Sequence, residues 1–426
     1  MKKLLILSIF FGILIAKEYE ITPQHIHRLK KICQKIKPGD EIILKGGIYN
    51  KKFPVITCSG SSKADVTIKA KKNEKVTIKK GWEIKASYLT IKNLNFKGNN
   101  NSLNYKKVIK HWWNPTPKMR KSGLLIEGSH ITLENNIIGN FPGVGVKFKG
   151  KSDYLTINHN IIYNNAWWTT GGTGGLVIKN IHQTDNSKKV KIKIINNLFF
   201  ANESRIISHV FKKGFAKMVI DEGESFLIQQ KDDASKKGAK SGKYNGRYLV
   251  KNNLILYNGK GSSLNKADNI DLIANDFYCN GTTATSKKAG GIRGNNTNND
   301  NFIDNAIQTC ADKKAISVKG KNNHFINNKT GKIYKDPQHL NFYNIYFKNR
   351  ANKLFESFKP MLNKYKIKVK PTNYKVNLTK EINDIIALIP KKANTKIIRQ
   401  KNKIIIKNIN NSNIKGLKKN FVLKLK

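Results

Sequence analysis

A short pattern that recurs along the chain constrains the fold more than any other feature. Each copy has alternating apolar residues, then Asn-Asn or a similar pair, then two apolar residues, as in "HITLENNII" (130–138) and "YLTINHNII" (154–162). Alternation over four or five residues is typical of a β-strand, and Asn favours a turn because it tolerates left-handed backbone angles and bonds its own backbone. The second position of the pair falls at Asn95, Asn136, Asn160, Asn197, Asn253, Asp276, Asn305 and Asn328.

The spacing of these positions indicates stacked coils. The intervals are 41, 24, 37, 56, 23, 29 and 23 residues, so a base period near 23 carries insertions. Such a period is typical of solenoids, and the leucine scaffold and helices of a leucine-rich repeat are absent. In a stack, equivalent Asn side chains can pair from coil to coil. We therefore predict an all-β fold, a right-handed parallel β-helix.

The ends of such a stack need covers, because each coil buries little surface alone. Residues 22–36 have apolar residues at roughly helical spacing and predict an N-terminal cap helix, and residues 353–367 predict a second helix over the last coil. Beyond about residue 370 the chain is rich in Lys, Asn and Ile, which predicts a small add-on or a partly disordered tail. We place the β-helix with its cap at 17–345 and the C-terminal cap and basic tail at 346–426.

The N-terminus predicts export. Two lysines precede an apolar run over residues 4–16, which is shorter than the about 20 residues of a membrane-spanning helix. This pattern is typical of a signal peptide over residues 1–16; the alternative is an uncleaved anchor. No later segment is apolar enough to cross a membrane, so we expect a monomer in the periplasm or outside the cell. An oxidising compartment suits disulfides, and three pairings are open to Cys33, Cys58, Cys279 and Cys310.

The charge balance predicts an acidic partner. The chain has 80 Lys+Arg against 27 Asp+Glu, a net charge of +53. Such a charge attracts nucleic acid, an anionic lipid surface or an acidic polysaccharide. Export argues against nucleic acid and favours an acidic polysaccharide. The alternative is that the abundance of Lys, Asn and Ile reflects genome base composition.

Three coils carry long insertions, which in solenoids form loops on one face. Adjacent coils lie about 4.8 Å apart, so loops that leave equivalent corners become neighbours. The segments are "KHWWNPTPKMRKSG" (110–123), "NNAWWTTGGTGG" (164–175) and a stretch that includes "VIDEGESFLIQQKDD" (219–233). We predict that four indoles bind sugar rings, although one of each pair can instead anchor its loop in the core. They are Trp112, Trp113, Trp167 and Trp168.

The third insertion concentrates acidic residues in an otherwise basic chain. Alternation along a strand puts Glu222 and Glu224 on one face and Asp221 on the other. We predict these three residues as ligands of a hard cation, and calcium accepts such irregular oxygen sets. Asp232 and Asp233 are weaker candidates in a polar stretch, and a solvated loop without metal is the alternative.

A β-elimination on a uronic acid needs the carboxylate charge neutralised and a base beside it, and a Lys or Arg can be that base if its pKa falls. Candidates are Arg247 in "YNGRYLV" and Lys260 in "YNGKGSS", with His209 as a secondary catalytic candidate. Tyr244 and Tyr248 are candidates for substrate binding. The hypothesis requires Arg247 or Lys260 close to the acidic residues. A hydrolase that uses Asp221 and Glu224 as acid and base is a further possibility.

The sequence resembles the secreted right-handed parallel β-helix repeat proteins of the pectate-lyase-like superfamily. The resemblance covers roughly residues 30–340 and rests on "KPGDEIILKGGIY" (37–49) and "YNNAWWTTGGTGGLVI" (163–178). One branch has an Asp-Gly-Asn-Gly segment, a Tyr-x-Gly-Arg strand and an Asn-Gly-Gly-Arg-Gly turn. Asp221 and Arg247 match these motifs, whereas Lys260 stands at the arginine of the turn.

The superfamily resemblance implies a lyase that cleaves an acidic, uronate-containing polysaccharide by β-elimination. The inserted loops on one face, the carboxylates and the basic charge agree with it. The first alternative is a non-catalytic glycan-binding or surface-attachment protein, and the second is a glycoside hydrolase or an epimerase. Fold alone does not fix the function.

Overall fold

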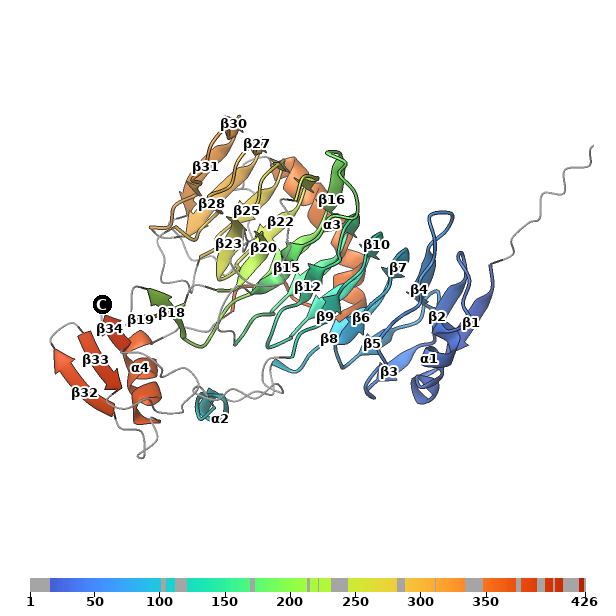
Figure 1. Cartoon of the computed structure of the whole chain (residues 1–426), viewed down its shortest axis with the longest axis horizontal. Helices are drawn as coiled ribbons and strands as arrows, with labels where there is room; N and C mark the ends of the chain where they lie inside the picture. The colour runs from blue at the N-terminus through green and yellow to red at the C-terminus, as the bar shows by residue number, and fades with distance from the viewer. Residues whose placement is uncertain are drawn as a thin grey trace, which may run out of the picture.

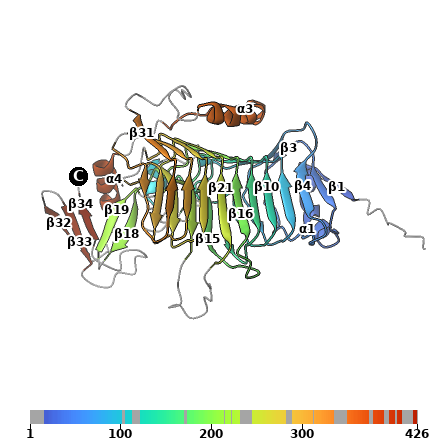
Figure 2. The same cartoon turned by 90° about the horizontal axis from the view of Figure 1, so that it is seen from above.

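The chain folds as a parallel β-helix, which confirms the predicted all-β class. Three long parallel sheets run side by side along the axis of the molecule (Figures 1 and 2). The computed structural model describes residues 16–100, 105–111, 121–168, 173–212, 215–220, 222–230, 244–281, 288–310, 312–333, 348–372, 377–388, 395–400, 403–408 and 421–424.

Among the described residues, the central coils each add one strand to each of the three sheets, whereas sheet C has fewer strands than sheets A and B at the ends of the stack. Sheet A has the order β1 (Glu18–Ile21), β2 (Glu41–Leu44), β4 (Val66–Ala70), β7 (Leu89–Lys92), β10 (Ile131–Glu134), β13 (Leu155–Asn158), β16 (Val190–Ile195), β21 (Arg247–Lys251), β24 (Ile270–Ile273), β27 (Asn301–Ile303) and β30 (His324–Ile326). Sheet B has the order β3 (Gly47–Tyr49), β5 (Val76–Ile78), β8 (Asn95–Lys97), β11 (Ile137–Gly139), β14 (Ile161–Tyr163), β17 (Leu198–Phe200), β22 (Leu254–Leu256), β25 (Asp276–Tyr278), β28 (Ala306–Cys310) and β31 (Lys329–Ile333). Sheet C has the order β6 (Trp82–Ile84), β9 (Leu124–Ile126), β12 (Val146–Gly150), β15 (Gly174–Ile181), β20 (Glu224–Gln229), β23 (Lys260–Asn265), β26 (Ile292–Asn295) and β29 (Ile316–Ser317), read from the first coil to the last.

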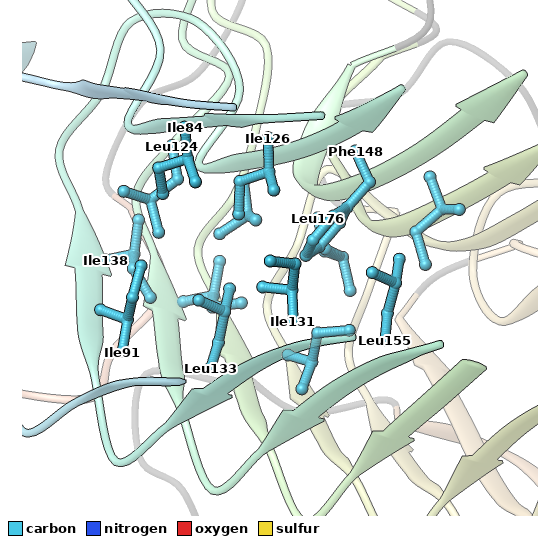
Figure 3. Close-up of a cluster of buried hydrophobic side chains, with 14 of the residues drawn as sticks. Ile84, Ile91, Leu124, Ile126, Ile131, Leu133, Ile138, Phe148, Leu155 and Leu176 are labelled. Atoms are coloured by element: carbon cyan, nitrogen blue, oxygen red, sulfur yellow. The ribbon is translucent and has the colours of Figure 1, made fainter. Parts of the chain in front are cut away.

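The core is a set of apolar stacks inside the coil. Ile131 on β10 pairs in register with Leu155 on β13, and both side chains are fully buried. The alternate position, Thr132 beside Thr156, faces outward and is half-buried. Apolar side chains from the three sheets meet in the interior (Figure 3). Because the coils repeat in register, the alternation in the sequence places the same kind of residue at each level.

A ladder of asparagines lines the corner between sheets A and B. The first residue of each Asn-Asn pair takes a left-handed backbone angle, such as φ 55° at Asn196. The second points inward: the Asn197 amide donates to the Ile157 carbonyl at 2.8 Å and to Asn253 Oδ1 at 3.0 Å. This confirms the predicted pairing, and the ladder contains Asn136, Asn160, Asn197, Asn253, Asn275, Asn305 and Asn328.

Two assigned positions differ from the sequence interpretation. The ladder uses Asn275, and the neighbouring Asp276 instead accepts hydrogen bonds from Arg350 at 2.6 and 3.0 Å. At the N-terminal end the inward position is Leu94, whose N–H donates to Asn136 Oδ1 at 3.1 Å, while Asn95 bonds the Thr77 hydroxyl. In both coils the inward position lies one residue before the position that the sequence pattern assigned.

A second ladder lines the corner between sheets B and C, and the sequence interpretation missed it. Its members lie five residues after members of the first ladder. Each side-chain amide donates to Oδ1 of the Asn in the next coil, at 2.9 to 3.0 Å. The recurrence of Asn five residues after members of the first ladder is the sequence signal that could have revealed this second ladder. The ladder contains Asn165, Asn202, Asn258 and Asn280.

Helices cover the N-terminal end and one flank. The predicted N-terminal helix is shorter than expected, with a turn η1 (Pro23–His25) followed by α1 (Arg28–Cys33), which buries Leu29 and Ile32 in the core. The helix α3 (Lys348–Tyr365) packs Leu354 and Phe358 on the outer side of sheet B, so it lies along the flank and not over the last coil (Figure 2). The physical reason is that the outer face of sheet B is apolar.

The C-terminal region is built into a small fourth sheet. Strands β32 (Thr395–Gln400), β33 (Lys403–Asn408) and β34 (Phe421–Lys424) join the hairpin of β18 (Ser208–Lys212) and β19 (Phe215–Val219), which belongs to the longest insertion (Figure 1). The helix α2 (Tyr105–Ile109) belongs to the first insertion, and α4 (Leu378–Ala387) belongs to the C-terminal region. The weakly patterned tail therefore has a strand partner more than 200 residues earlier, since Phe421 on β34 pairs with Ala216 on β19.

Two disulfides join Cys33 to Cys58 and Cys279 to Cys310. No helix within the described ranges is long and apolar enough to span a membrane. Most of the predicted signal peptide, residues 1–15, lies outside the described residues.

Replacement of one ladder residue tests how much the asparagine ladder between sheets A and B contributes to the free energy of unfolding. We expect Asn197→Leu to lower the free energy of unfolding by about 3 kcal/mol, because it leaves buried polar groups on two neighbouring coils without partners. Urea unfolding measures this, with Asn186→Leu in an exposed turn as the control, where we expect less than about 0.5 kcal/mol. Equal effects of the two variants would contradict a ladder that stabilises the stack.

A buried carboxyl group near the C-terminal end of the stack makes stability depend on pH. Asp300 Oδ2 lies 2.6 Å from the Thr297 hydroxyl, which also bonds the Ala267 carbonyl. The threonine has one proton, so a protonated Asp300 that donates to it satisfies both groups. Burial raises the pKa of Asp300 to about 7.

The unfolded chain releases this proton near pH 3.9, whereas the folded chain keeps it to about pH 7. Between these values the folded state binds more protons, so the stability that Asp300 contributes falls as pH rises, by at most about 1.4 kcal/mol per pH unit. Urea unfolding between pH 4.5 and 8 measures the slope. We expect Asp300→Asn to flatten it, and an unchanged slope would contradict the assignment.

Candidate functional site

The inserted acidic segment meets two neighbouring coils at the corner between sheets B and C. Strands β15, β20 and β23 start there, and Glu224 pairs in register with Gly174 on one side and Lys260 on the other. A glycine is required at 174, since a Cβ there would lie 2.3 Å from the Glu224 carbonyl oxygen. The corner cluster, as we name it, consists of Glu222, Glu224, Lys260 and Ser263.

Glu224 and Lys260 form a buried ion pair. Lys260 Nζ donates to Glu224 Oε1 at 2.9 Å, and the Ser263 hydroxyl donates to the same oxygen at 3.2 Å. The side chains are 4% and 3% exposed. Glu224 Oε2 is buried and has no hydrogen-bond partner among the described residues. Such a pair is costly to break from one side, because the remaining charge stays buried.

Glu222 lies at the same corner but has its own partner. Its Oε2 accepts a hydrogen bond from the Thr173 N–H at 2.8 Å. Gly223 separates the two acids with φ 94°, and a Cβ there would lie 2.5 Å from Glu203 Cα. The Gly223 carbonyl accepts from the Lys260 N–H at 3.0 Å. The acidic segment is thus fixed between the coils before and after it.

The described residues of the corner cluster do not fit the calcium ion expected from the sequence. Calcium takes six to eight oxygen ligands, and no group of three acidic, His or Cys side chains that could hold a metal occurs among the described residues. The Lys260 ammonium already lies 2.9 Å from Glu224, where a cation would be expected. Asp221, Asp232 and Asp233 lie outside the described residues.

Arg247 and its neighbouring tyrosines, which the sequence analysis assigned to the same site, lie on another side of the coil. Arg247 on β21 of sheet A pairs with Asp271, and this hydrogen bond raises the pKa of the guanidinium. Tyr244 donates to Asp153 at 2.7 Å, and Tyr248 is fully buried with its hydroxyl 2.9 Å from Gln230 Nε2. After β20 the chain turns from sheet C to sheet A, so closeness in sequence does not bring these residues to the corner.

The tryptophans of the second insertion are internal. Trp167 and Trp168 are 4% and 1% exposed, so neither indole offers a face to a sugar ring. The Arg205 guanidinium lies 5.9 Å from the Trp167 ring. These two indoles therefore anchor the loop, which was the alternative for one of each pair. Trp112 and Trp113 lie outside the described residues, and His209 lies on β18 in the fourth sheet.

A sequence model of the chondroitinase B family matches residues 24–298. The chain belongs to the chondroitinase B family. The corner cluster lies within the matched region. No curated protein matches the sequence.

Several solved structures are similar to parts of this chondroitinase B family chain. The PL6 family alginate lyase AlyGC has 16% identity and a TM-score of 0.40, over 69% of this chain and 38% of that one. A mannuronic acid specific polysaccharide family 6 lyase from human gut microbiota has 16% identity and a TM-score of 0.39, over 71% of this chain and 66% of that one. Pectate lyase Pel9A has 12% identity and a TM-score of 0.34, over 73% and 80% of the two chains.

In this family member a row of outward side chains crosses sheet C beside the corner cluster. The register places Lys147, Val177, Leu227, Ser263 and Arg293 in this outer row, one per strand. Ser263 belongs to both groups. With about 4.8 Å between strands, the row carries Lys147 about 10 Å from Leu227.

Lys147 is the candidate base that sequence analysis missed. Burial lowers the pKa of its ammonium, and the like charges of Lys179 and Lys149 lower it further. Its neighbours on either side, Val146 and Phe148, point into the core. The strand alternation "VKFKG" (146–150) was a signal that Lys147 faces outward, but nothing in the sequence marks it among so many lysines.

The buried ion pair predicts a coupled effect on stability. We expect Glu224→Gln to lower the free energy of unfolding by about 3 kcal/mol, because the buried Lys260 ammonium then loses the carboxylate of Glu224. The variant Glu224→Gln/Lys260→Met should recover most of this loss. Glu356→Gln, at the exposed pair with Lys359, is the control, with less than about 1 kcal/mol expected. Additive effects at Glu224 and Lys260 in urea unfolding would contradict the pairing.

Proposed function

We propose that this protein is a lyase that cleaves an acidic, uronate-containing polysaccharide by β-elimination. The chain belongs to a family named for chondroitinase B, and chondroitin is an acidic polysaccharide. The net charge of +53 favours such a substrate. The observation that carries the proposal is the half-buried Lys147, next to like charges, in the outer row that meets the corner cluster at Ser263.

The elimination needs a base with a free electron pair. Burial lowers the pKa of Lys147, which increases the share of uncharged amine, and this amine takes the proton from C5 of the uronate. The C4–O4 bond then breaks and a C4=C5 double bond forms. The departing oxygen takes up a proton, which the newly formed ammonium of Lys147 can return, so the step balances without a further reactant.

The carboxylate of the same sugar must be stabilised while C5 loses its proton. Lys149 and Lys179, whose charges lower the pKa of Lys147, also attract an anionic substrate. The same two charges therefore serve the base and the substrate. The ion pair of Glu224 and Lys260 fixes β20 against β23, and through Ser263 it holds the outer row in place. We assign these residues positioning roles.

A non-catalytic glycan-binding protein is the second candidate function. It is favoured by the engagement of both acids, Glu222 with Thr173 and Glu224 with Lys260, in bonds within the protein. On this account the carboxylates only stabilise the fold. Replacing Lys147 would then leave the affinity for an acidic polysaccharide close to that of the unchanged protein.

We further propose that the protein is exported and acts as a monomer. The lysine-led apolar start of the chain supports export, and so do two disulfides, which suit an oxidising compartment. Calcium binding would require ligands outside the described residues, and the proposed mechanism uses no calcium ion.

The activity test follows the ultraviolet absorbance of unsaturated uronate ends during incubation with alginate, chondroitin sulfate and polygalacturonate. We expect absorbance to rise with at least one polymer, and Lys147→Arg to lower kcat/KM at least 100-fold because arginine stays protonated. Lys193→Arg on sheet A is the control and should keep the activity. The pH profile should rise and level off below the ordinary lysine pKa of about 10.4.

Adding a chelator to the same assay distinguishes activity without a metal ion from activity that needs a bound metal ion. We expect activity to persist, since Lys260 already neutralises Glu224. Loss of activity would place a metal on residues that include Asp221. An active Lys147→Arg variant, or reducing ends without absorbance, would contradict the proposed elimination.

A further inference from the structure

A basic groove lies between the outer side of sheet B and the segment that follows α3. It has a volume of about 460 Å³, within the range of about 300–1,000 Å³ that is typical of ligand sites. Asn95, Tyr163 and Phe200 line it from sheet B. Residues 365–372 form the opposite wall. None of this wall lies within residues 24–298, the region that the family model matches.

The charge of this basic groove has one sign. The described residues that line it include five cations and no acid, and the cations are Lys97, Arg205, Lys366, Lys368 and Lys370. The Arg205 guanidinium pairs with the Glu203 carboxylate at 3.2 Å, and Glu203 is only 1% exposed. Like charges that converge on a hollow raise the local concentration of anions.

The lysine-bearing wall is held in place at both ends. Before it, the Tyr365 hydroxyl donates to the Val76 carbonyl at 3.3 Å. After it, the Thr372 hydroxyl bonds Glu203. Between them, Ile367 and Val369 pack on the apolar outer face of sheet B, while Lys366, Lys368 and Lys370 are exposed. The alternation presents the three ammonium groups from a fixed segment.

The floor of the basic groove combines an apolar surface with amide and hydroxyl groups. The rings of Tyr163 and Phe200 stack with centroids 5.0 Å apart. The Asn140 amide donates to the Tyr163 hydroxyl at 3.0 Å, and the Asn164 amide donates to Asn140 Oδ1 at 2.6 Å. Sugars have apolar ring faces and hydroxyl edges, so this floor suits them better than it suits a small inorganic anion.

The basic groove and the corner cluster share one corner of the β-helix. Arg205 borders the groove, and its partner Glu203 packs its Cα against Gly223, between the two acids of the cluster. A long polymer is therefore able to reach both places on one molecule.

We propose that the basic groove binds a second stretch of acidic polysaccharide outside the cleavage site. The class of ligand rests on the proposed function, and the location rests on the groove itself. The site holds the polymer through carboxylate or sulfate groups on the lysines and through a sugar ring on the half-buried Tyr163, whose ring Phe200 supports from below. It raises the affinity for polymers over short oligosaccharides, because two bound stretches on one chain act together.

The test compares two triple variants in binding to alginate and chondroitin sulfate polymers by isothermal titration calorimetry. Lys366→Ala/Lys368→Ala/Lys370→Ala should weaken binding at least fivefold for a polymer that the unchanged protein binds. Lys319→Ala/Lys321→Ala/Lys329→Ala removes the same charge from exposed positions on the last coil and should change the affinity less than twofold. Replacement of the three groove lysines with arginine should keep the affinity, and neutral dextran should not bind.

Equal losses in the two alanine variants, equal binding of dextran, or no binding of either acidic polymer would overturn the groove assignment. Binding is measured without turnover, so the proposed function fails separately. A protein that binds through the groove lysines but yields no unsaturated ends keeps the groove and loses the lyase. In an active enzyme, the groove variant should raise KM for the polymer and leave kcat for a trisaccharide unchanged.

Discussion

The hydrogen bond from one asparagine side chain to the next holds the coils of this protein in register. Each inward amide at the corner of sheets A and B satisfies backbone carbonyls of its own and the neighbouring coil, as Asn197 does with Ile157 and Ile195. Without it, every corner would leave buried backbone groups unpaired. The second ladder does the same five residues later. Because both corners are fixed, side chains at equivalent positions stack into rows across each sheet.

The polar groups of the candidate site depend on that registration. Lys260 follows the ladder residue Asn258 by two positions, and Glu203 follows Asn202 directly. The longest insertion leaves the stack after Asn202 and returns at Glu224, which then pairs with Lys260. An irregular segment with acidic residues is thereby fixed against a regular frame. The C-terminal region adds a second layer, since its helix and its lysine-bearing segment both pack on sheet B.

The β-helix could be predicted from sequence because its period, alternation and Asn pairs are local. The closeness of Lys260 to the acidic segment could also be anticipated, since both lie at coil corners, and the structure pairs Lys260 with Glu224. Arg247 could not be placed, because two residues near in sequence belong to different sheets once the chain turns. The burial of Trp167 and Trp168 depends on neighbouring coils. Lys147 became a candidate only when the positions of Lys149 and Lys179 were known. The fourth sheet joins strands about 200 residues apart, which no local pattern records.

The central claim is that the outer row beside the corner cluster performs an elimination. Mass spectrometry of oligosaccharides released from a digested acidic polysaccharide tests it most directly. Elimination leaves a double bond, so each new non-reducing end should be lighter by one water than the corresponding product of hydrolysis. Products that all carry this deficit, and that disappear with Lys147→Arg, are the predicted result. Products with the full mass of hydrolysed chains would contradict the account.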